Sequence, residues 1–135
     1  MNKYSKIIAL IPARSRSQVI KNKNMVKLNK KPLIHYTIHA AKKSKYIDEV
    51  YVSSNDKKIL EYASSQKVNI INRPDYISKS TSHSRHAVTH FINKTLKRKK
   101  GETLIIFLQP TSPLRNAKHI DNSITKVIDN NKSLV

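Results

Sequence analysis

Short runs of apolar residues alternate along this chain with segments in which apolar residues recur every three or four positions. A continuous apolar run of about four to eight residues is typical of a strand that is buried on both faces. Recurrence at three and four positions is typical of a helix that buries one side. The runs predict strands at residues 7–11, 49–54, 68–71 and 103–108.

Four amphipathic segments separate or follow these strands and predict helices. Pro32 favours the start of the first helix, and Asn55 and Asp56 favour the start of the second. Gly101 ends the third, after a basic run whose cations suit the negative end of a helix dipole. The apolar positions expected to face the core are Leu33, Ile34, Ile38 and Ala41 in the first helix, Ile59, Leu60 and Ala63 in the second, Val88, Phe91, Ile92 and Leu96 in the third, and Ile120, Ile124, Val127 and Ile128 in the fourth.

This alternation predicts an α/β fold with a mostly parallel sheet and helices on both of its faces. Four short strands make a small core for a chain of this polarity. Leu134 and Val135 also have the character of the first residues of a further buried strand. We therefore expect residues 1–135 to be the N-terminal portion of a single larger domain, so that the fold is incomplete.

Positive charge dominates the composition. The 135 residues include 27 Lys and Arg against 8 Asp and Glu, a formal net charge of +19, and 21 of the cations are Lys. Such a balance predicts attraction to polyanions, so a nucleic-acid-binding domain with strongly salt-dependent affinity is one interpretation. The alternative is a Lys-rich bias spread over solvated faces, which concerns solubility and steering rather than a specific partner.

Several classes of protein are excluded by what the sequence lacks. There are no cysteines, which excludes disulfides, thiolate metal sites and cysteine nucleophiles. No apolar run approaches the roughly 20 residues that span a bilayer, and the chain opens without the apolar region or the cleavage site of a signal peptide. We therefore expect a cytoplasmic protein without a membrane partner.

Ligands of parallel α/β sheets bind beyond the carboxyl ends of the strands, so the loops that follow the expected strands are candidate sites. The first of these loops carries Arg14, Arg16, Lys21 and Lys23, and no acid precedes Asp48. Guanidinium and ammonium groups make charge-assisted hydrogen bonds to phosphate oxygens, so this loop could hold a polyphosphate. It lacks the glycines of a Walker loop, and a solvated basic loop is the alternative interpretation.

Two other groups of residues raise the question of a metal. His83, His86 and His90 recur along one expected helix, but the apolar stripe beside them favours ordinary surface or core-edge histidines. Asp56 follows a strand and could approach a metal, and it also suits the start of a helix. The metal ligands stay unknown, and no Ser/His/Asp triad can be built because the sequence has no nucleophile elbow.

Five segments, in order along the whole chain, match the motifs of one known family. They are Ile11-Pro12-Ala13-Arg14 and the residues that follow it to Asn24, then Lys31-Pro32-Leu33-Ile34, Val52-Ser53-Ser54-Asn55-Asp56, Arg73-Pro74, and Phe107-Leu108-Gln109-Pro110-Thr111-Ser112-Pro113-Leu114-Arg115. With these motifs the chain resembles the acylneuraminate cytidylyltransferases, the CMP-sialic acid synthetases. Related sugar nucleotidyltransferases share Ile-Pro-Ala-Arg, but the combination with Gln-Pro-Thr-Ser-Pro-Leu-Arg is specific.

The resemblance implies an enzyme with a Rossmann-like nucleotidyltransferase fold. The reaction would join CTP to an acidic, sialic acid-like nine-carbon 2-keto sugar and give the CMP-sugar and pyrophosphate. Phosphoryl transfer of this kind relies on positioning and charge neutralisation. Mg²⁺ is the implied cofactor, although the family's metal-holding aspartates lie beyond Val135. A homodimer is the implied assembly, and a nucleic acid is not the expected partner.

The resemblance also implies roles for individual residues. Arg14 and Lys23 would be catalytic by neutralising the charge of the triphosphate. The nucleotide would be held by Arg14, Ser17, Asn24, Arg73, Ser82 and Ser84, and the sugar by Gln109, Thr111, Ser112 and Arg115. Each residue also has an ordinary structural alternative, such as a loop contact for Arg73, a helix cap for Ser84 or a surface position for Arg115.

The first motif departs from the family pattern. Ser15 and Arg16 stand where the family has two glycines, Gln18 where it has a lysine, Val19 where it has a further glycine, and Ser80 where it has an aspartate. Glycines allow the backbone to approach phosphate closely, and the lysine supplies a direct charge, so these changes bear on activity. A catalytically inactive nucleotide-binding remnant of the family is therefore the alternative prediction.

Overall fold

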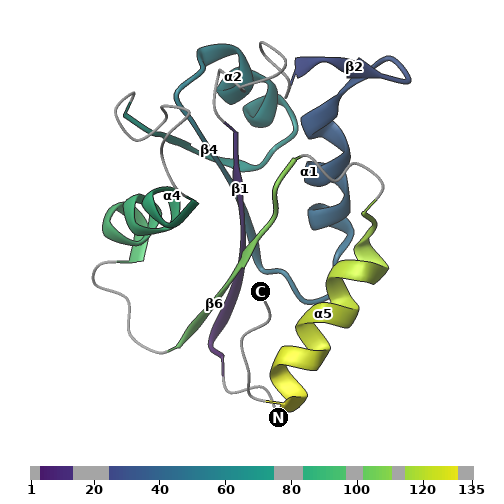
Figure 1. Ribbon diagram of the computed structural model, residues 1–135, viewed down its shortest axis with the longest axis vertical. Coiled ribbons are helices and arrows are strands. Elements are labelled where there is room, and N and C mark those ends of the chain that lie inside the picture. Colours follow the sequence, from purple (N-terminus) through teal and green to yellow (C-terminus); the bar gives the residue numbers. More distant parts are fainter. Residues whose placement is uncertain (1–3, 14–24, 75–83, 97–101, 111–114, 131–135) are drawn as a thin grey trace.

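The computed structural model describes residues 4–13, 25–74, 84–96, 102–110 and 115–130. Its centre is a four-stranded sheet (Figure 1). The strands are β1 (Lys6–Pro12), β4 (Glu49–Ser54), β5 (Asn69–Asn72) and β6 (Thr103–Phe107), in the spatial order β5-β4-β1-β6. Every adjacent pair in this sheet is parallel, which confirms the predicted fold class.

β1 lies between β4 and β6 and is almost completely buried. Its residues 7–11 are each at most 3% exposed. A central strand covered on both faces must be apolar at every position, which is why this segment is an unbroken apolar run. β6 lies at the edge of the sheet, and all five of its residues are only half-buried.

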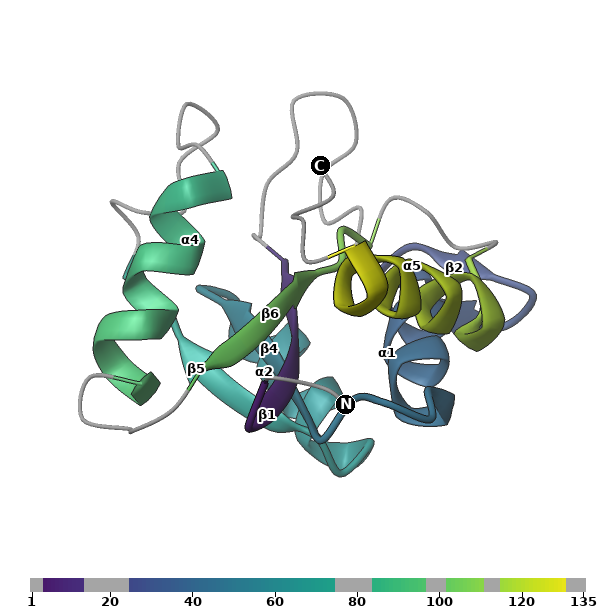
Figure 2. The ribbon, with the colours of Figure 1, turned by 90° about the horizontal axis from the view of Figure 1, so that it is seen from below.

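Helices cover both faces of the sheet, as predicted. The helices α1 (Leu33–Lys43), α2 (Lys57–Ser65) and α5 (Ala117–Asn130) pack on one face. On the other face lies α4 (Ser84–Phe91), which continues as a short π-helical segment, η2 (Ile92–Leu96). Figure 2 shows α4 on one side of the sheet and α1 and α5 on the opposite side.

Alternate side chains of β1 enter two separate core clusters. Ile7, Ala9 and Ile11 pack against α1, α2 and α5 in the larger cluster. Ile8 and Leu10 point to the opposite face and pack against Phe91 in the smaller cluster, as the two-residue period of a strand requires. The core therefore lies on both sides of one central strand.

Most of the predicted core positions of the helices are confirmed. Four of them, Leu33, Leu60, Val88 and Ile128, are only half-buried, and the side chain of Leu96 lies outside the described part of the chain. Ile34, Ile38, Ala41, Ile59, Ala63, Phe91, Ile120, Ile124 and Val127 are buried. Ile92 is 40% exposed, so its predicted place in the core is wrong. The reason is local: the helix widens into η2 at Ile92, which changes the angle between successive side chains from that of a regular α-helix.

A small hairpin lies between β1 and α1, where the pattern of apolar residues predicts no strand. β2 (Lys27–Leu28) pairs with β3 (Lys31–Pro32) in antiparallel fashion and leaves a two-residue turn, Asn29 and Lys30. Both turn residues have positive φ, 51° and 68°, as a type I′ hairpin turn requires. Two-residue strands carry no measurable period, so the pattern of apolar residues could not predict them.

Two lysines occupy backbone conformations that favour glycine. Lys30 has φ of 68°, and Lys67, just after α2, has φ of 62°. We expect Lys30→Gly and Lys67→Gly each to raise the free energy of unfolding by about 0.5–1 kcal/mol, because glycine has no Cβ to clash at positive φ. Urea unfolding measures the change. Lys27→Gly is the matched control, since Lys27 lies in an ordinary strand and its replacement should stabilise nothing; a gain there would contradict the conformational explanation.

Among the residues that the structure describes, no helix is long and apolar enough to cross a membrane. Leu134 and Val135 lie outside the described residues, so the further strand expected there stays a prediction.

Candidate functional site

The carboxyl ends of the four parallel strands form one edge of the sheet, and this edge is the candidate site. Three backbone N–H groups extend the strand pairing just beyond the strand ends: Ala13 donates to Ser53 O at 2.8 Å, Arg73 to Ser54 O at 2.8 Å, and Leu108 to Leu10 O at 2.9 Å. The chain leaves β5 at one side of the sheet and returns as β6 beside β1. Ligands of open parallel sheets bind at such a change in strand order, between β1 and β6.

Arg73 is a buried cation at this edge. Its side chain is only 6% exposed, and its backbone N–H bonds to the end of β4. The period of β5 places it on the same face as Ile71, which packs with Phe91 of α4. A buried guanidinium makes strong charge-assisted hydrogen bonds to oxyanions, so Arg73 is suited to contact an anion at this edge. Its predicted contact with the nucleotide stays a prediction.

His90 lies beside Arg73 and is itself buried. Its side chain is 9% exposed, and neither ring nitrogen has a hydrogen-bond partner within the described part of the chain. Burial lowers the pKa of His90, and the positive charges of Lys94 and Arg73 lower it further. The imidazole is therefore kept neutral, which avoids a second positive charge next to the buried guanidinium.

Acid should destabilise the protein through His90. Its folded pKa lies below the ordinary value of 6.5, so the unfolded chain binds more protons as the pH falls below about 6.5. The stability that neutral His90 contributes is present above this pH and is lost as the pH falls toward the folded pKa. We expect the unfolding free energies of the wild type and His90→Leu to differ by a constant amount above about pH 6.5. Below that pH the wild type should lose stability relative to the variant. Urea unfolding at a series of pH values measures this, and a constant difference throughout would contradict it.

Arg115 lies on the other side of the change in strand order, between β6 and α5. Its side chain is half-buried, and Nη1 is buried without a hydrogen-bond partner among the residues described. Burial lowers the pKa of this guanidinium. An unpaired buried donor costs about 1–3 kcal/mol, so Nη1 is suited to meet an anionic ligand. The alternative of an ordinary surface cation does not account for this burial.

Gln109 follows the end of β6 and is exposed, although Leu108 and Pro110 on either side of it are buried. Arg73 and Gln109 follow the two outermost strands of the sheet, with β4 and β1 between them. Three strand spacings of about 4.8 Å place these two positions roughly 14 Å apart. This span suits an extended ligand rather than a single small ion.

The other predicted site residues are only partly covered by the structure. Ser84 is the first residue of α4, and its predicted roles as a nucleotide contact or a helix cap stay predictions. Seven residues lie outside the described ranges: Arg14, Ser17, Lys23, Asn24, Ser82, Thr111 and Ser112. The structure thus brings Arg73 together with His90, and places Gln109 and Arg115 on the β6 side of the same edge.

The residues that the structure describes do not fit a Mg²⁺ site built by the protein. No three of their His, Cys, Asp or Glu side chains come together in a way that could hold a metal. The Asp56 carboxylate accepts the Lys58 backbone N–H at 2.8 Å and caps α2, which confirms its helix-starting role. His86 is exposed, His90 lies at the core edge, and His83 is outside the described residues. The metal ligands stay unknown.

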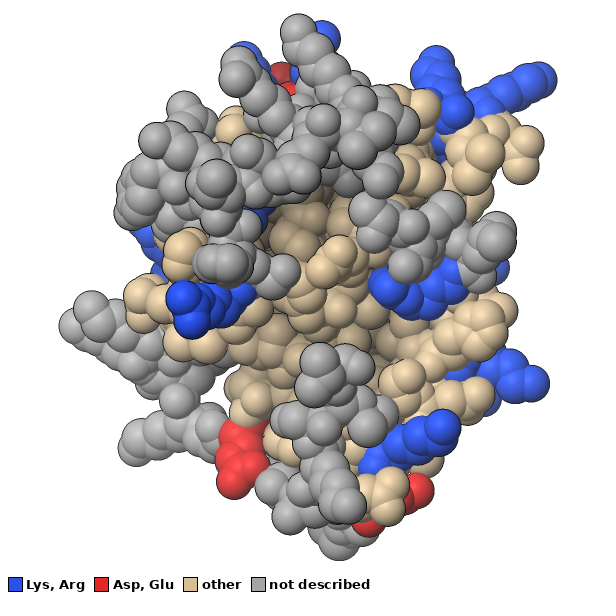
Figure 3. Space-filling model, in the orientation of Figure 1, with Lys and Arg blue, Asp and Glu red and all other residues tan. Residues whose placement is uncertain are grey.

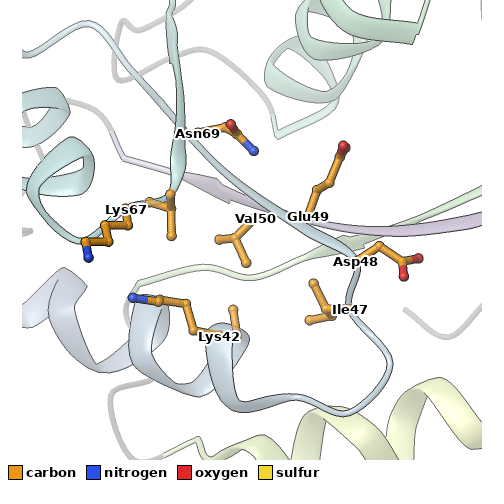
Figure 4. A pocket seen from close by; sticks show the side chains of 9 residues that line it. Lys42, Ile47, Asp48, Glu49, Val50, Lys67 and Asn69 are labelled. Atoms are coloured by element: carbon orange, nitrogen blue, oxygen red, sulfur yellow. The ribbon is translucent and has the colours of Figure 1, made fainter.

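A cavity of about 260 Å³ lies at the opposite edge of the sheet, at the amino ends of β4 and β5 (Figure 4). Figure 4 shows Lys42 and Lys67 at one end of it and Asp48 and Glu49 at the other. Three of these groups make structural bonds: Lys42 Nζ donates to Gln66 O at 2.7 Å, Asp48 accepts the Ile7 N–H at 2.8 Å, and Glu49 pairs with Lys6 at 3.2 Å. These bonds account for Lys42, Asp48 and one oxygen of Glu49, whereas Oε2 of Glu49 is buried without a hydrogen-bond partner among the described residues.

The positive charge is dispersed on the face shown in Figure 3. The described Lys and Arg side chains stand at separate places on this face, and much of the surface between them belongs to residues that are not described. A nucleic-acid site is expected to show a continuous basic patch or stripe. The described cations on this face form no such patch, and the nucleic-acid interpretation stays untested because the basic runs near residues 14–24 and 97–100 lie outside the described residues.

Sequence reasoning missed two features of this edge. The sequence favours an ordinary surface or core-edge position for His90, and the core-edge position is confirmed, but the sequence does not indicate that His90 lies beside Arg73. Ser53 was noted as part of a motif, but its hydroxyl is completely buried and has no hydrogen-bond partner in the described part of the chain. The alternation along β4 could have indicated that Ser53 shares a face with Tyr51, toward α4.

The parallel sheet, its change in strand order and the guanidinium groups at its carboxyl edge define a Rossmann-like α/β protein suited to an extended anionic ligand. More particularly, the chain belongs to the cytidylyltransferase family, because the family model described as Cytidylyltransferase matches residues 8–135. This confirms the resemblance that the motifs indicated.

Individual relatives agree with this membership. The chain is 35% identical over 120 residues to the N-acylneuraminate cytidylyltransferase of Escherichia coli O18:K1:H7, covering 89% of this chain and 28% of that protein. It is 32% identical over 120 residues to the CMP-N,N'-diacetyllegionaminic acid synthase of Legionella pneumophila, covering 88% and 52%. The chain thus spans about half or less of the length of these relatives.

The fold is also that of a solved structure. A structure of CMP:2-keto-3-deoxy-manno-octonic acid synthetase, complexed with CTP, superposes with a TM-score of 0.76 at 18% identity. The match covers 94% of this chain and 49% of that one. At this identity the likeness concerns the fold, which is thereby confirmed as Rossmann-like.

Proposed function

We propose that this chain carries the CTP-binding part of a cytidylyltransferase that acts on an acidic nine-carbon 2-keto sugar. The observation that carries the proposal is the placement of two guanidinium groups along one ligand edge: Arg73 is buried beyond β5, and Arg115 has a buried Nη1 beyond β6. Membership of the cytidylyltransferase family supports CTP as the nucleotide. The names of the two bacterial relatives support the sugar class.

In this proposal the two ends of the edge hold different parts of the substrates. Arg73 and Ser84, with Ser82, Ser17 and Asn24, hold the nucleotide. Arg14 and Lys23 neutralise the triphosphate, and Gln109, Thr111, Ser112 and Arg115 hold the sugar. Residues 1–135 then form the N-terminal portion of the nucleotidyltransferase domain, and the homodimer stays a prediction.

The proposed reaction is an in-line displacement at phosphorus. A hydroxyl oxygen of the sugar forms a bond to the α-phosphorus of CTP and loses its proton, while the bond to the bridging oxygen of pyrophosphate breaks. Negative charge grows on the leaving pyrophosphate, so guanidinium and ammonium groups that meet it lower the barrier. The protein's own contribution is to place these cations and to orient the two substrates.

Two measurements test the proposal. Calorimetry with CTP, UTP and ATP should show preferential binding of CTP by the 135-residue chain. Pyrophosphate release, with Mg²⁺ supplied as the counter-ion of CTP, should depend on a sialic, legionaminic or pseudaminic acid. Absence of CTP binding, also in a chain extended to the length of its relatives, would rule the proposal out.

The altered first motif favours a second candidate, an inactive nucleotide-binding remnant. Ser15 and Arg16 replace glycines, and Gln18 replaces a phosphate-binding lysine of the family pattern. The combined variant Ser15→Gly, Arg16→Gly and Gln18→Lys tests this candidate. If CTP binds but the wild type releases no pyrophosphate, rescue by the variant locates the defect in this turn, and failure of rescue supports the remnant.

A further inference from the structure

The start of α5 is closed by two reciprocal hydrogen bonds. The side-chain Oδ1 of Asn116 accepts the backbone N–H of His119 at 2.9 Å, and Nδ1 of His119 accepts the backbone N–H of Asn116 at 3.3 Å. This is a capping box in which histidine takes the third helical position, where Glu or Gln is usual. Because a backbone N–H can only donate, Nδ1 must be the unprotonated nitrogen of the ring.

The helix behind this cap is firmly held by the rest of the protein. Ile120 and Ile124 are buried in the larger core cluster. The Asp121 carboxylate accepts the backbone N–H of Lys45, two residues after the end of α1, at 3.1 Å. The core therefore sets the position of the first turn of α5, and the capping box sets the direction from which the chain enters it.

Arg115 is the residue directly before this cap, and its side chain needs a defined position. Nη1 is buried without a hydrogen-bond partner in the described part of the chain, so an anion that binds here would contact the guanidinium where it lies. A mobile arginine would lose rotamer freedom on binding, which weakens affinity, whereas a preorganised one loses less. Fixing the backbone at Arg115 is thus a way to strengthen the anion contact.

We propose that His119 is a positioning residue, which acts through the capping box to hold Arg115 in place for an oxyanion of the substrate. The identity of that oxyanion rests on the proposed function: it is a phosphate of CTP or the carboxylate of the acidic sugar. His119 acts through Arg115 and not on the anion itself. The sequence carries the signal as Asn-x-x-His at the start of an amphipathic helix.

A double-mutant cycle with two ligands tests this role. CTP and N-acetylneuraminic acid are titrated separately into the wild type, His119→Ala, His119→Gln, Arg115→Ala and the double variant His119→Ala/Arg115→Ala. We expect His119→Ala to weaken the ligand that Arg115 contacts by about fivefold, the usual effect of losing a cap. His119→Gln should stay within about twofold, because the amide oxygen restores the capping box.

In the Arg115→Ala background, His119→Ala should cause no further loss of ligand affinity, because His119 acts on the ligand only through Arg115. Thr125→Ala is the matched control. It removes a side-chain hydrogen bond to Asp121 O, at 2.9 Å, from the same helix away from the cap, and should bind both ligands like the wild type.

A measurement without ligand separates this inference from the proposed function. NMR relaxation of the Arg115 Nε–Hε group should show increased mobility in His119→Ala and not in His119→Gln. If the wild type binds neither ligand but Arg115 responds in this way, the proposed function fails and the positioning role stands. Unchanged Arg115 mobility in His119→Ala, or an equal loss of affinity with and without Arg115, would overturn the positioning role.

Discussion

Replacing Arg73 by alanine is expected to weaken CTP binding by roughly 100-fold, and lysine at this position to recover only part of the loss. A hydrogen bond to a charged group contributes about 1.5–3 kcal/mol, and each 1.4 kcal/mol is about tenfold in affinity, so two such bonds give this magnitude. Arg73 is 6% exposed, which reduces solvent screening of its charge. Lysine keeps the charge but lacks the planar fork of donors. Calorimetric titration of CTP measures the change.

The control must separate loss of a contact from loss of charge or of the fold. Lys94→Ala removes an exposed cation that, like Arg73, acts on His90, and should change CTP affinity by no more than about twofold. Circular dichroism and urea unfolding establish whether Arg73→Ala and Arg73→Lys remain folded. Equal losses of CTP affinity in Arg73→Ala and Lys94→Ala would mean that Arg73 acts only through long-range charge. Unchanged CTP affinity in Arg73→Ala would mean that Arg73 is not part of the CTP site.

The strands of this fold were predictable because a strand that is covered on both faces leaves an unbroken apolar run. The run at residues 7–11 is the central strand β1, and the equally apolar run at residues 103–108 became the half-exposed edge strand β6. Apolar residues on both faces of a strand indicate that other elements of the protein cover both faces. They do not indicate which neighbours pair with the strand, because pairing depends on backbone hydrogen bonds that every residue can make.

The site was predictable only as far as its residues belong to motifs at strand ends. Arg73 and Gln109 follow β5 and β6, so the rule for parallel sheets places both at the carboxyl edge. The neighbourhood of His90 and Arg73 could not be predicted, since it depends on how α4 packs across the sheet. The two hydrogen bonds between Asn116 and His119 could have been predicted, because a capping box is local in sequence.

Phe91 is the side chain that fixes α4 to the sheet and, through α4, the position of His90. It is completely buried and packs on Ile8 and Leu10 of β1. Its ring meets that of Tyr51 edge to face, with centroids 4.9 Å apart and an angle of 66° between the ring planes. Within the described residues, α4 is the helix that covers this face of the sheet, so few other contacts can replace those of Phe91.

We therefore expect Phe91→Ala to lower the free energy of unfolding by about 3–5 kcal/mol, through lost burial and the cavity left behind. A domain of this size has a total free energy of unfolding of only about 5–15 kcal/mol, so Phe91→Ala could unfold the protein. Urea unfolding is therefore also measured for Phe91→Leu, which should lower the free energy of unfolding less and remain folded. Ile92→Ala is the matched control: Ile92 is the next residue but 40% exposed, and its loss should cost less than about 1 kcal/mol. Equal effects of Phe91→Ala and Ile92→Ala would mean that α4 is held by its backbone and not by the ring of Phe91. Hydrogen exchange should localise the loss to α4 and the strands beneath it, because the larger core cluster on the opposite face keeps its own contacts.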